Sequence, residues 1–282
     1  MLVTYSFGLE HRVRQGLFFP AFDGVADPHR LVALAQAAEE AGWDGIFLWD
    51  HLLYDGDVTN ILDAYISLAA IASATTTIQL GAMVTPLIRR RPQVLARQAV
   101  TLDLLSRGRL ILGFGIGDDG EVGELSKFGE ITDAKERGRA LSEGLEVLTG
   151  LLSGRSVHHI GEHYRADDVT FQPTAAREGG IPIWLAARWP NAVPIRRAAH
   201  YGGIFVIQMN DPADVAALRQ RLVDEGADVE HFDIVVSGAV GDDPSPWARA
   251  GVDWFLSWIG PYHMDFDEVH EMIVEGPRTI KT

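Results

Sequence analysis

The sequence predicts an α/β fold, a (β/α)8 TIM barrel formed as a single domain over residues 1–282, with an insertion between its fourth and fifth strands. First, eight apolar segments of strand length alternate with helical patterns, as parallel strands joined by helical crossovers require. Second, several of these segments are apolar on both faces, which is typical of strands covered on both sides. Third, no change of composition marks a linker, which favours a closed barrel over an open doubly wound sheet.

The first four strand–helix units are expected before residue 118. After an apolar run at 16–20, Asp27 and Pro28 begin a helix that Gly42 ends, because Asp caps well, Pro fits the first turn and Gly suits the C-cap. The core face of this helix is expected to hold Leu31, Leu34, Ala35 and Ala38. The next strands are expected at 45–50, 78–84 and 109–115, and the next helices at 61–73 and from Pro92 to Gly108, the latter with Val94, Thr101, Leu102 and Leu105 toward the core.

The fifth unit is delayed by the insertion, at about residues 118–180. We expect a polar loop, a long helix with leucines on one stripe, and a hairpin that turns near Gly161. The stripe consists of Leu141, Leu145, Leu148 and Leu152. Regular alternation then resumes, with strands expected at 181–186, 202–208, 232–238 and 252–260 and helices at 191–200 and 212–225.

Composition and charge exclude several classes of partner. The chain has 24 basic and 39 acidic residues and a formal charge of -15, so nucleic acid or an acidic membrane surface would be repelled overall. It has no cysteine, which removes disulfides, thiol nucleophiles and cysteine metal sites. The N-terminal segment lacks a basic start followed by an apolar run, and no segment approaches the roughly 18 apolar residues of a membrane span. We expect a cytoplasmic protein that acts on a small molecule and binds neither nucleic acid nor membrane.

A glycine-rich segment, LGFGIGDDG at 112–120, matches the dinucleotide-binding pattern G-x-G-x-x-G from Gly115 onward. A Rossmann motif belongs to the first strand and opens directly into a helix, whereas this one follows the fourth strand and leads into acids. In a barrel the same glycines lie at the C-terminal mouth, where active sites are built. Gly115 and Gly117 would there let a flat ligand approach the backbone; the alternative is that they only turn the chain.

Candidate functional side chains follow three further strands. Asp50 and His51 end the second strand, where a carboxylate beside an imidazole suits acid–base chemistry; the alternative is a loop-capping Asp beside a surface His. Residues 83–85 end the third strand as an uncharged shelf that suits a flat ring or a barrel lid. Residues 186–188 end the fifth strand and form a candidate phosphate site with Asn191 at the start of the next helix.

Other polar and aromatic groups carry weaker signals. We interpret the basic run at 89–91 as a solvated loop, with contact to an anionic cofactor tail or substrate as the alternative. His158, His159 and His163 lie near Glu162 on the hairpin, but they lack the helical H-E-x-x-H spacing, so no metal site is expected. No nucleophile motif is present, which favours a cofactor as the carrier of the chemistry. Several aromatic side chains are expected to cluster at or just beyond the strand ends, namely Trp49, Tyr54, Trp184, Trp189, Trp254 and Trp258.

The sequence resembles the luciferase-like monooxygenase superfamily, the flavin- and deazaflavin-dependent (β/α)8 barrels, in four blocks. The blocks are AEEAGWDGIFLWDH at 38–51, LGAMVTPLIRRRPQVLARQAVTLDLLSRGRLILGFGIG at 80–117, RGRALSEGLEVLTGLLSG at 137–154 followed by GEHY at 161–164, and IPIWLAAR at 181–188. Their order and spacing make the resemblance specific. It implies coenzyme F420 or FMN at the C-terminal mouth of the barrel, and a homodimer.

The resemblance also implies roles for single residues. His51 would handle a proton, with Asp50 beside it and Asp118 as a second acid–base candidate. A bulge at 81–84, often with a non-proline cis peptide bond, would support the back of the cofactor ring, and the turn at 186–188 would bind phosphate. The implied cofactor-binding residues are Asp50, His51, Ala82, Met83, Thr85, Gly115, Gly117, Ala186, Ala187, Arg188 and Asn191.

Two departures from the family pattern bear on function. The turn after the fifth strand reads Ala-Ala-Arg instead of a glycine pair, which gives Arg188 more importance. Asp55 stands where sugar-phosphate dehydrogenases of the family carry a tryptophan, which argues against a sugar phosphate as substrate. We expect an oxidoreductase that transfers hydride between F420 or FMN and a small organic substrate, and the Asp–His pair favours F420. The alternatives are an FMN-dependent monooxygenase, a non-catalytic cofactor-binding or partner subunit, and a metal-dependent hydrolase barrel.

Overall fold

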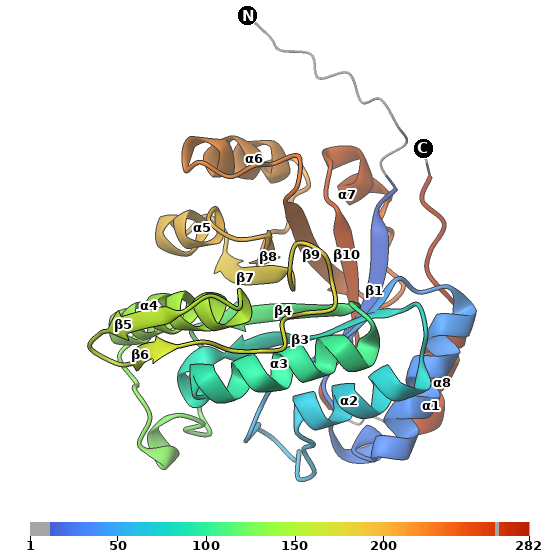
Figure 1. Cartoon of the computed structure of the whole chain (residues 1–282). Coiled ribbons are helices and arrows are strands. Elements are labelled where there is room, and N and C mark those ends of the chain that lie inside the picture. The colour runs from blue at the N-terminus through green and yellow to red at the C-terminus, as the bar shows by residue number, and fades with distance from the viewer. Residues whose placement is uncertain (1–11, 263–264, 282) are drawn as a thin grey trace, which may run out of the picture.

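The computed structural model describes residues 12–262 and 265–281 and contains the expected closed barrel of parallel strands (Figure 1). The strand order is β1-β10-β9-β8-β7-β4-β3-β2, and β1 closes the barrel by pairing with both β2 and β10. The strands are β1 (Arg14–Phe19), β2 (Gly45–Leu48), β3 (Gln79–Pro86), β4 (Leu110–Gly115), β7 (Ile183–Arg188), β8 (Gly203–Ile207), β9 (Asp233–Ala239) and β10 (Trp254–Trp258). The predicted fold class is confirmed. Residues 1–11, which carry part of the prediction about targeting segments, lie outside the described residues.

Helices pack around the barrel, and those whose bounds the sequence predicted begin and end close to the predicted positions; the helices at 245–250 and 266–274 were not predicted. In α1 the Asp27 side chain accepts hydrogen bonds from the amides of His29 and Arg30, and Gly42 ends the helix at a left-handed φ of 89°. No helix in the described ranges is long and apolar enough to cross a membrane. The helices are α1 (Pro28–Ala41), α2 (Ala64–Ala74), α3 (Pro92–Ser106), α4 (Ala134–Leu152), α5 (Ala192–Ala198), α6 (Asp214–Asp224), α7 (Ser245–Ala250) and α8 (Phe266–Val274).

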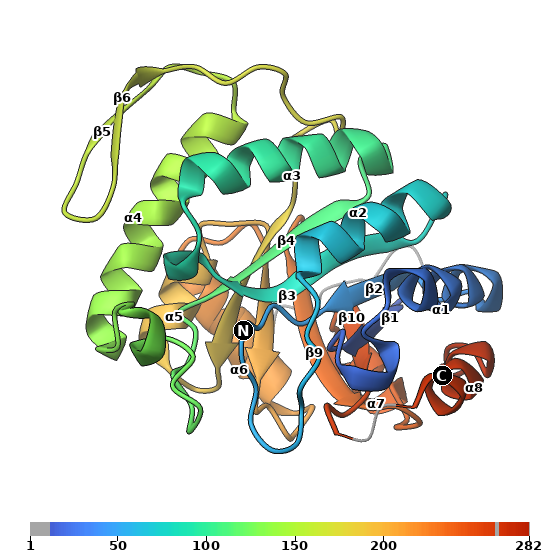
Figure 2. The same ribbon diagram turned by 90° about the horizontal axis from the view of Figure 1, so that it is seen from below.

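The insertion between β4 and β7 consists of a loop, α4 and an antiparallel hairpin, as predicted. The hairpin strands are β5 (Val157–Ile160) and β6 (Arg165–Val169), and Figure 2 shows them outside α3 and α4, away from the barrel strands. Leu141, Leu145 and Leu148 are buried on the inner face of α4, whereas Leu152 is only partly buried. The loop before α4 is the part of the insertion that reaches the mouth of the barrel.

The core face of α3 differs from the prediction. Leu102 is buried as expected, but Val94 and Leu105 are 51% and 45% exposed, and Thr101 is exposed as well. The buried face consists of Pro92, Leu95, Ala96, Ala99, Val100, Leu102, Asp103 and Ser106. The helix has apolar residues on two adjacent faces, and its packing between α2 and α4 selects the face that meets the barrel.

Two tryptophans that were expected near the mouth lie at the opposite end of the barrel. Trp254 begins β10 and Trp184 is the second residue of β7, and both are fully buried. Their rings are 5.5 Å apart and flank Phe47 at 5.6 and 5.4 Å. Bulky side chains are needed to fill the interior of an eight-stranded barrel, so these rings form its lower layers and the space for a site lies above them.

Candidate active site

The mouth of the barrel between β3, β4 and β7 is lined by small residues. Side chains alternate along a strand, so Ala186 faces inward above the buried Trp184. A Cβ atom added to Gly115 would lie 3.6 Å from the Ala186 Cβ atom and 3.0 Å from the Val84 Cγ2 atom. Val84 and Ala186 are partly exposed. Together these three residues form a low apolar wall at the C-terminal ends of the strands.

Strand β3 carries the expected bulge and a cis peptide bond. The pairing register between β3 and β4 shifts between Ala82 and Thr85, and the bond from Met83 to Val84 is cis. The side chains of Ala82, Met83 and Thr85 are buried, and the Thr85 hydroxyl group lies 3.1 Å from the hydroxyl group of Tyr65 on α2. Of the residues in this bulge, Val84 is the one that is exposed at the mouth.

Asp50 lies after β2 as a buried carboxylate in a tight ion pair. Its Oδ2 and Oδ1 atoms accept hydrogen bonds from Arg90 Nε and Nη2 at 3.0 and 2.9 Å, and its side chain is 2% exposed. Arg89 donates to the backbone carbonyl of the same residue. Asp50 raises the pKa of Arg90, although burial alone would lower it. Both oxygens of Asp50 are therefore already occupied, which ties the end of β2 to the segment after β3.

The interpretation of residues 89–91 as a solvated loop is wrong for two of the three arginines. The side chains of Arg89 and Arg90 are 4% and 17% exposed, and the Arg90 guanidinium group also lies 4.6 Å from the centre of the Tyr65 ring. Arg91 is the exposed member and precedes α3. Buried arginines need carboxylate partners, and Asp50 and Glu124 provide them.

His51 is the partly exposed member of the Asp–His pair. Its side chain is 31% exposed, and its Nδ1 atom lies 3.2 Å from each carboxylate oxygen of Glu124. The rings of Phe22, Trp49 and Tyr54 surround it at centroid distances of 6.2, 6.1 and 5.1 Å. The Nε2 atom has no hydrogen-bond partner among the described residues. One nitrogen of the imidazole is thus held by a carboxylate, and the other is free for a ligand.

Sequence reasoning missed Glu124 altogether. No motif marks this residue, which is one of several acids in DDGEVGEL at 118–125. Its contact with His51 joins positions 73 residues apart, so local patterns carry no signal for it. The sequence did contain a signal for the ion pairs of Arg89 and Arg90. These basic residues follow the end of one strand, and Asp50 follows the end of the neighbouring strand, so opposite charges are brought together at the mouth.

Asp118 and Arg188, predicted separately, approach each other at the mouth. Arg188 Nη2 lies 3.8 Å from Asp118 Oδ2, and the two side chains are 57% and 74% exposed. Gly117 turns the chain before Asp118 at a left-handed φ of 71°. Ala187 is buried on the outer face of β7, and the Asn191 side chain, placed before α5, makes no capping hydrogen bond. This side of the mouth therefore offers one exposed cation and one exposed carboxylate.

Two of the hairpin histidines, His159 and His163, contact carboxylates of α4. Glu143 accepts from His163 Nδ1 at 2.7 Å and lies 3.1 Å from His159 Nε2, while His163 Nε2 lies 2.6 Å from Glu136. His158 is exposed and faces Asp167 and Asp168 across the hairpin at 3.5 Å. These contacts explain how the hairpin is attached to the long helix of the insertion.

The comparison with known families agrees with this geometry. Residues 9–273 match the family model described as luciferase-like monooxygenase. The chain belongs to the luciferase-like monooxygenase family. It is thus an enzyme of an oxidoreductase family, and the mouth of the barrel is where its fold class builds active sites.

Curated relatives of this luciferase-like protein include two enzymes named for coenzyme F420. The chain is 30% identical over 234 residues to the F420-dependent hydroxymycolic acid dehydrogenase of Mycobacterium tuberculosis (strain ATCC 25618 / H37Rv), covering 80% of this chain and 62% of that protein. It is 31% identical over 247 residues to the F420-dependent glucose-6-phosphate dehydrogenase of Gordonia bronchialis, covering 82% and 69%. The chain therefore spans about two thirds of the length of these two relatives.

Solved structures share the fold at lower sequence identity. An F420-dependent secondary alcohol dehydrogenase in complex with an F420-acetone adduct superposes with a TM-score of 0.76 at 16% identity, covering 94% of this chain and 98% of that one. Monooxygenase RslO1 from Streptomyces bottropensis superposes with a TM-score of 0.74 at 20% identity, covering 93% and 96%. Both superpositions show the same barrel fold over most of this chain.

Proposed function

We propose that this protein is an F420-dependent oxidoreductase that transfers a hydride between the deazaflavin, bound at the C-terminal mouth of the barrel, and a small organic substrate. The observation that carries the proposal is the partly exposed imidazole of His51, held at the mouth by the buried Glu124. The two relatives at 30% and 31% identity, both named as F420-dependent dehydrogenases, support the choice of cofactor.

The residues at the mouth fit a planar, anionic cofactor. Gly115, Val84 and Ala186 form a wall without long side chains, against which a flat ring can lie. A phosphate group can be held after β7, by the half-exposed guanidinium group of Arg188 and by the side chain of Asn191, which makes no capping hydrogen bond. When bound, the deazaflavin supplies the hydride acceptor or donor.

The protein's own chemical contribution is proton handling. When a hydroxyl group is oxidised to a carbonyl, a proton leaves it together with the hydride, and His51 can accept that proton at Nε2. The Asp118 carboxylate, which lies 3.8 Å from Arg188 at the mouth, is the second candidate. Asp50 holds the strand end in place, because Arg90 occupies both of its oxygens.

Cofactor binding provides the first test. The purified protein is titrated separately with F420 and FMN, and its absorption spectrum is recorded after gel filtration. We expect F420 to change its fluorescence on binding and to be retained. If neither ligand responds, the proposal fails; if FMN alone is retained, an FMN-dependent monooxygenase is favoured.

A variant pair tests the assigned proton carrier. We expect His51→Gln to bind F420 normally and to reduce F420 with a panel of secondary alcohols about 100-fold or more slowly, the usual contribution of a general base. His231→Gln is the matched control, because that imidazole is 80% exposed and contacts only Asp228 among the described residues. Equal turnover in the two variants would remove His51 from the mechanism.

We also infer a homodimer, from the resemblance to the family. The exposed apolar side chains of Ile66 on α2 and of Val94 and Leu105 on α3 support it, being 68%, 51% and 45% exposed. Light scattering on the purified protein measures the mass directly, and a monomer at micromolar concentration would contradict this inference.

A further inference from the structure

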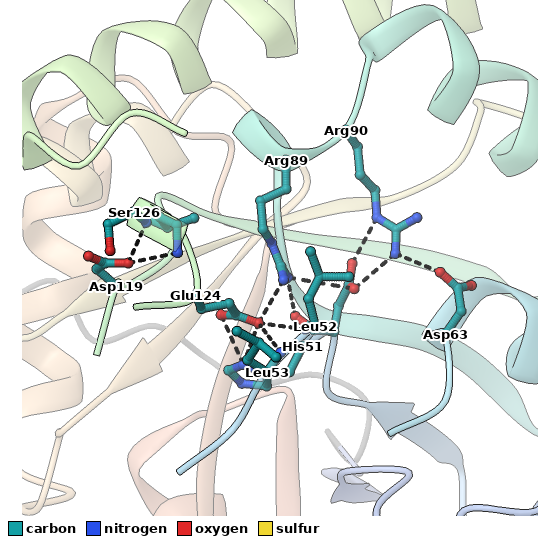
Figure 3. A network of polar contacts seen from close by, with 11 residues as sticks. His51, Leu52, Leu53, Asp63, Arg89, Arg90, Asp119, Glu124 and Ser126 are labelled. Carbon is teal, nitrogen blue, oxygen red and sulfur yellow. Dashed lines mark hydrogen bonds and ion pairs between the residues drawn. The ribbon is translucent and has the colours of Figure 1, made fainter. Parts of the chain in front are cut away.

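Glu124 is a buried carboxylate that connects the loop after β4 to the end of β2. The residue is 3% exposed. Its Oε1 atom accepts hydrogen bonds from the Leu52 amide at 2.6 Å and from Arg89 Nη1 at 2.7 Å, with the Leu53 amide at 3.4 Å. Both of its oxygens lie 3.2 Å from His51 Nδ1 (Figure 3). A carboxylate so enclosed has little freedom to turn away from the imidazole.

The backbone around Glu124 is itself held in a defined turn. Asp119 Oδ1 accepts hydrogen bonds from the amides of Leu125 and Ser126 at 2.7 and 2.8 Å, and the Glu124 amide donates to the Asp119 carbonyl at 3.0 Å. Leu125 is fully buried beside it. The position of the carboxylate is therefore set by the protein's own contacts, as accurate positioning of a reacting group requires.

The contacts of Glu124 determine which nitrogen of His51 carries hydrogen. Burial alone would raise the pKa of Glu124, but the hydrogen bond from His51, the charges of His51 and Arg89 and the amide of Leu52 outweigh burial and lower it. The carboxylate is thus ionised at neutral pH and can only accept hydrogen bonds. Nδ1 of His51 must then be protonated, so Nε2 is the atom that gains or loses a proton.

We propose that Glu124 is the positioning residue of this site: it holds His51 in the Nδ1–H tautomer and so presents Nε2 for proton exchange with the substrate. The inference rests on the proposed function for its catalytic meaning, but the tautomer is a property of the protein alone. An ionised partner at Nδ1 also stabilises the imidazolium that forms when Nε2 accepts a proton.

Arg89 partly neutralises the negative charge of Glu124 that faces His51. Its guanidinium group, 4% exposed, shares Glu124 Oε1 with the backbone amides, so the imidazole faces a nearly neutral ion pair instead of an isolated carboxylate. Among the described residues, the Tyr54 ring also packs against the imidazole, and burial raises the pKa of its hydroxyl group, which stays neutral. These contacts keep the orientation of the imidazole.

The tautomer can be measured without cofactor or substrate. In uniformly ¹⁵N-labelled protein, the imidazole nitrogen resonances of His51 are assigned by their loss in His51→Gln and followed by NMR from pH 5 to pH 9. We expect Nδ1 to carry hydrogen throughout this range. An Nε2–H tautomer in the wild-type protein at high pH would overturn the proposal.

Two variants then separate positioning from folding. Glu124→Gln removes the negative charge, and Glu124→Gln with Arg89→Met removes the buried ion pair as a unit, so that no uncompensated charge remains. In whichever of the two folds, we expect a mixture of both His51 tautomers. Glu121→Gln is the control, because Glu121 is exposed in the same turn and its replacement should leave the tautomer unchanged. An unchanged tautomer in the folded variant would contradict the proposal.

Kinetics with F420 provide an additional readout. We expect the folded Glu124 variant to bind F420 within about twofold of the wild type and to lose at least about tenfold in kcat, with partial recovery in Glu124→Asp. An unchanged kcat would remove Glu124 from the mechanism. If the wild type binds neither F420 nor FMN, the proposed function fails, while the NMR experiment still decides whether Glu124 sets the tautomer.

Discussion

Replacing Asp50 by asparagine tests whether the buried ion pair at the mouth stabilises the barrel. The substitution keeps the shape of the side chain but removes the charge that faces Arg90 Nε and Nη2 at 3.0 and 2.9 Å. Arg90, 17% exposed, would retain only Asp63 at 3.2 Å as a carboxylate partner among the described residues. Breaking one side of a buried ion pair costs about 3–5 kcal/mol, because the remaining charge stays desolvated.

The loss is large enough to measure by two methods. For a chain of this size each kcal/mol lowers Tm by about 2–4 °C, so we expect a decrease of about 6–20 °C in Asp50→Asn. Urea unfolding followed by tryptophan fluorescence measures the free energy of unfolding, and calorimetry measures Tm. The matched control is Asp63→Asn, whose side chain is 43% exposed and which should cost less than about 1 kcal/mol.

The double variant Asp50→Asn with Arg90→Met sharpens this test. It removes both charges, so we expect it to be more stable than Asp50→Asn alone, although it lacks one more native contact. If Asp50→Asn and Asp63→Asn lose the same free energy of unfolding, or if the double variant is less stable than Asp50→Asn, the assignment of Asp50 to a structural ion pair is wrong.

Three further predictions concern other parts of the barrel. Burial alone would raise the pKa of Glu39, but backbone amides at 76–78 lower it to about 2. The ionised form therefore stabilises the fold above pH 4.5, and this contribution is lost as the pH falls through about 2. Glu39→Gln should thus cost about 2 kcal/mol at pH 7 and progressively less as the pH is lowered toward 2, measured by urea unfolding. Gly113→Ala would place a Cβ atom 2.6 Å from the Ala82 carbonyl oxygen and should destabilise the protein by about 1–3 kcal/mol, whereas an unchanged Tm would show that the β3 bulge can shift. Arg188→Ala should weaken F420 binding about tenfold at unchanged Tm, and equal affinity in fluorescence titration would exclude it as a phosphate ligand.

Much of the fold follows from local patterns in the sequence. Alternating strand and helix segments predicted the barrel, Asp27 and Gly42 predicted the ends of α1, and the turn near Gly161 predicted the hairpin. These features depend on periodicity, capping and turn chemistry within a few residues. The positions of Asp50, His51 and the glycines at the strand ends follow from the same patterns, because all strands of a parallel barrel end at one mouth.

The contacts among those residues were decided only by the tertiary structure. Glu124 meets His51 across 73 residues because the loop after β4 folds back over the end of β2, and no spacing rule predicts where an irregular loop returns. Arg89 and Arg90 are buried because barrel closure brings two carboxylates to them, although a basic run is normally solvated. The sequence alone thus determined which elements form and where their ends lie, whereas closure of the barrel decided which charged groups pair and which nitrogen of His51 remains free.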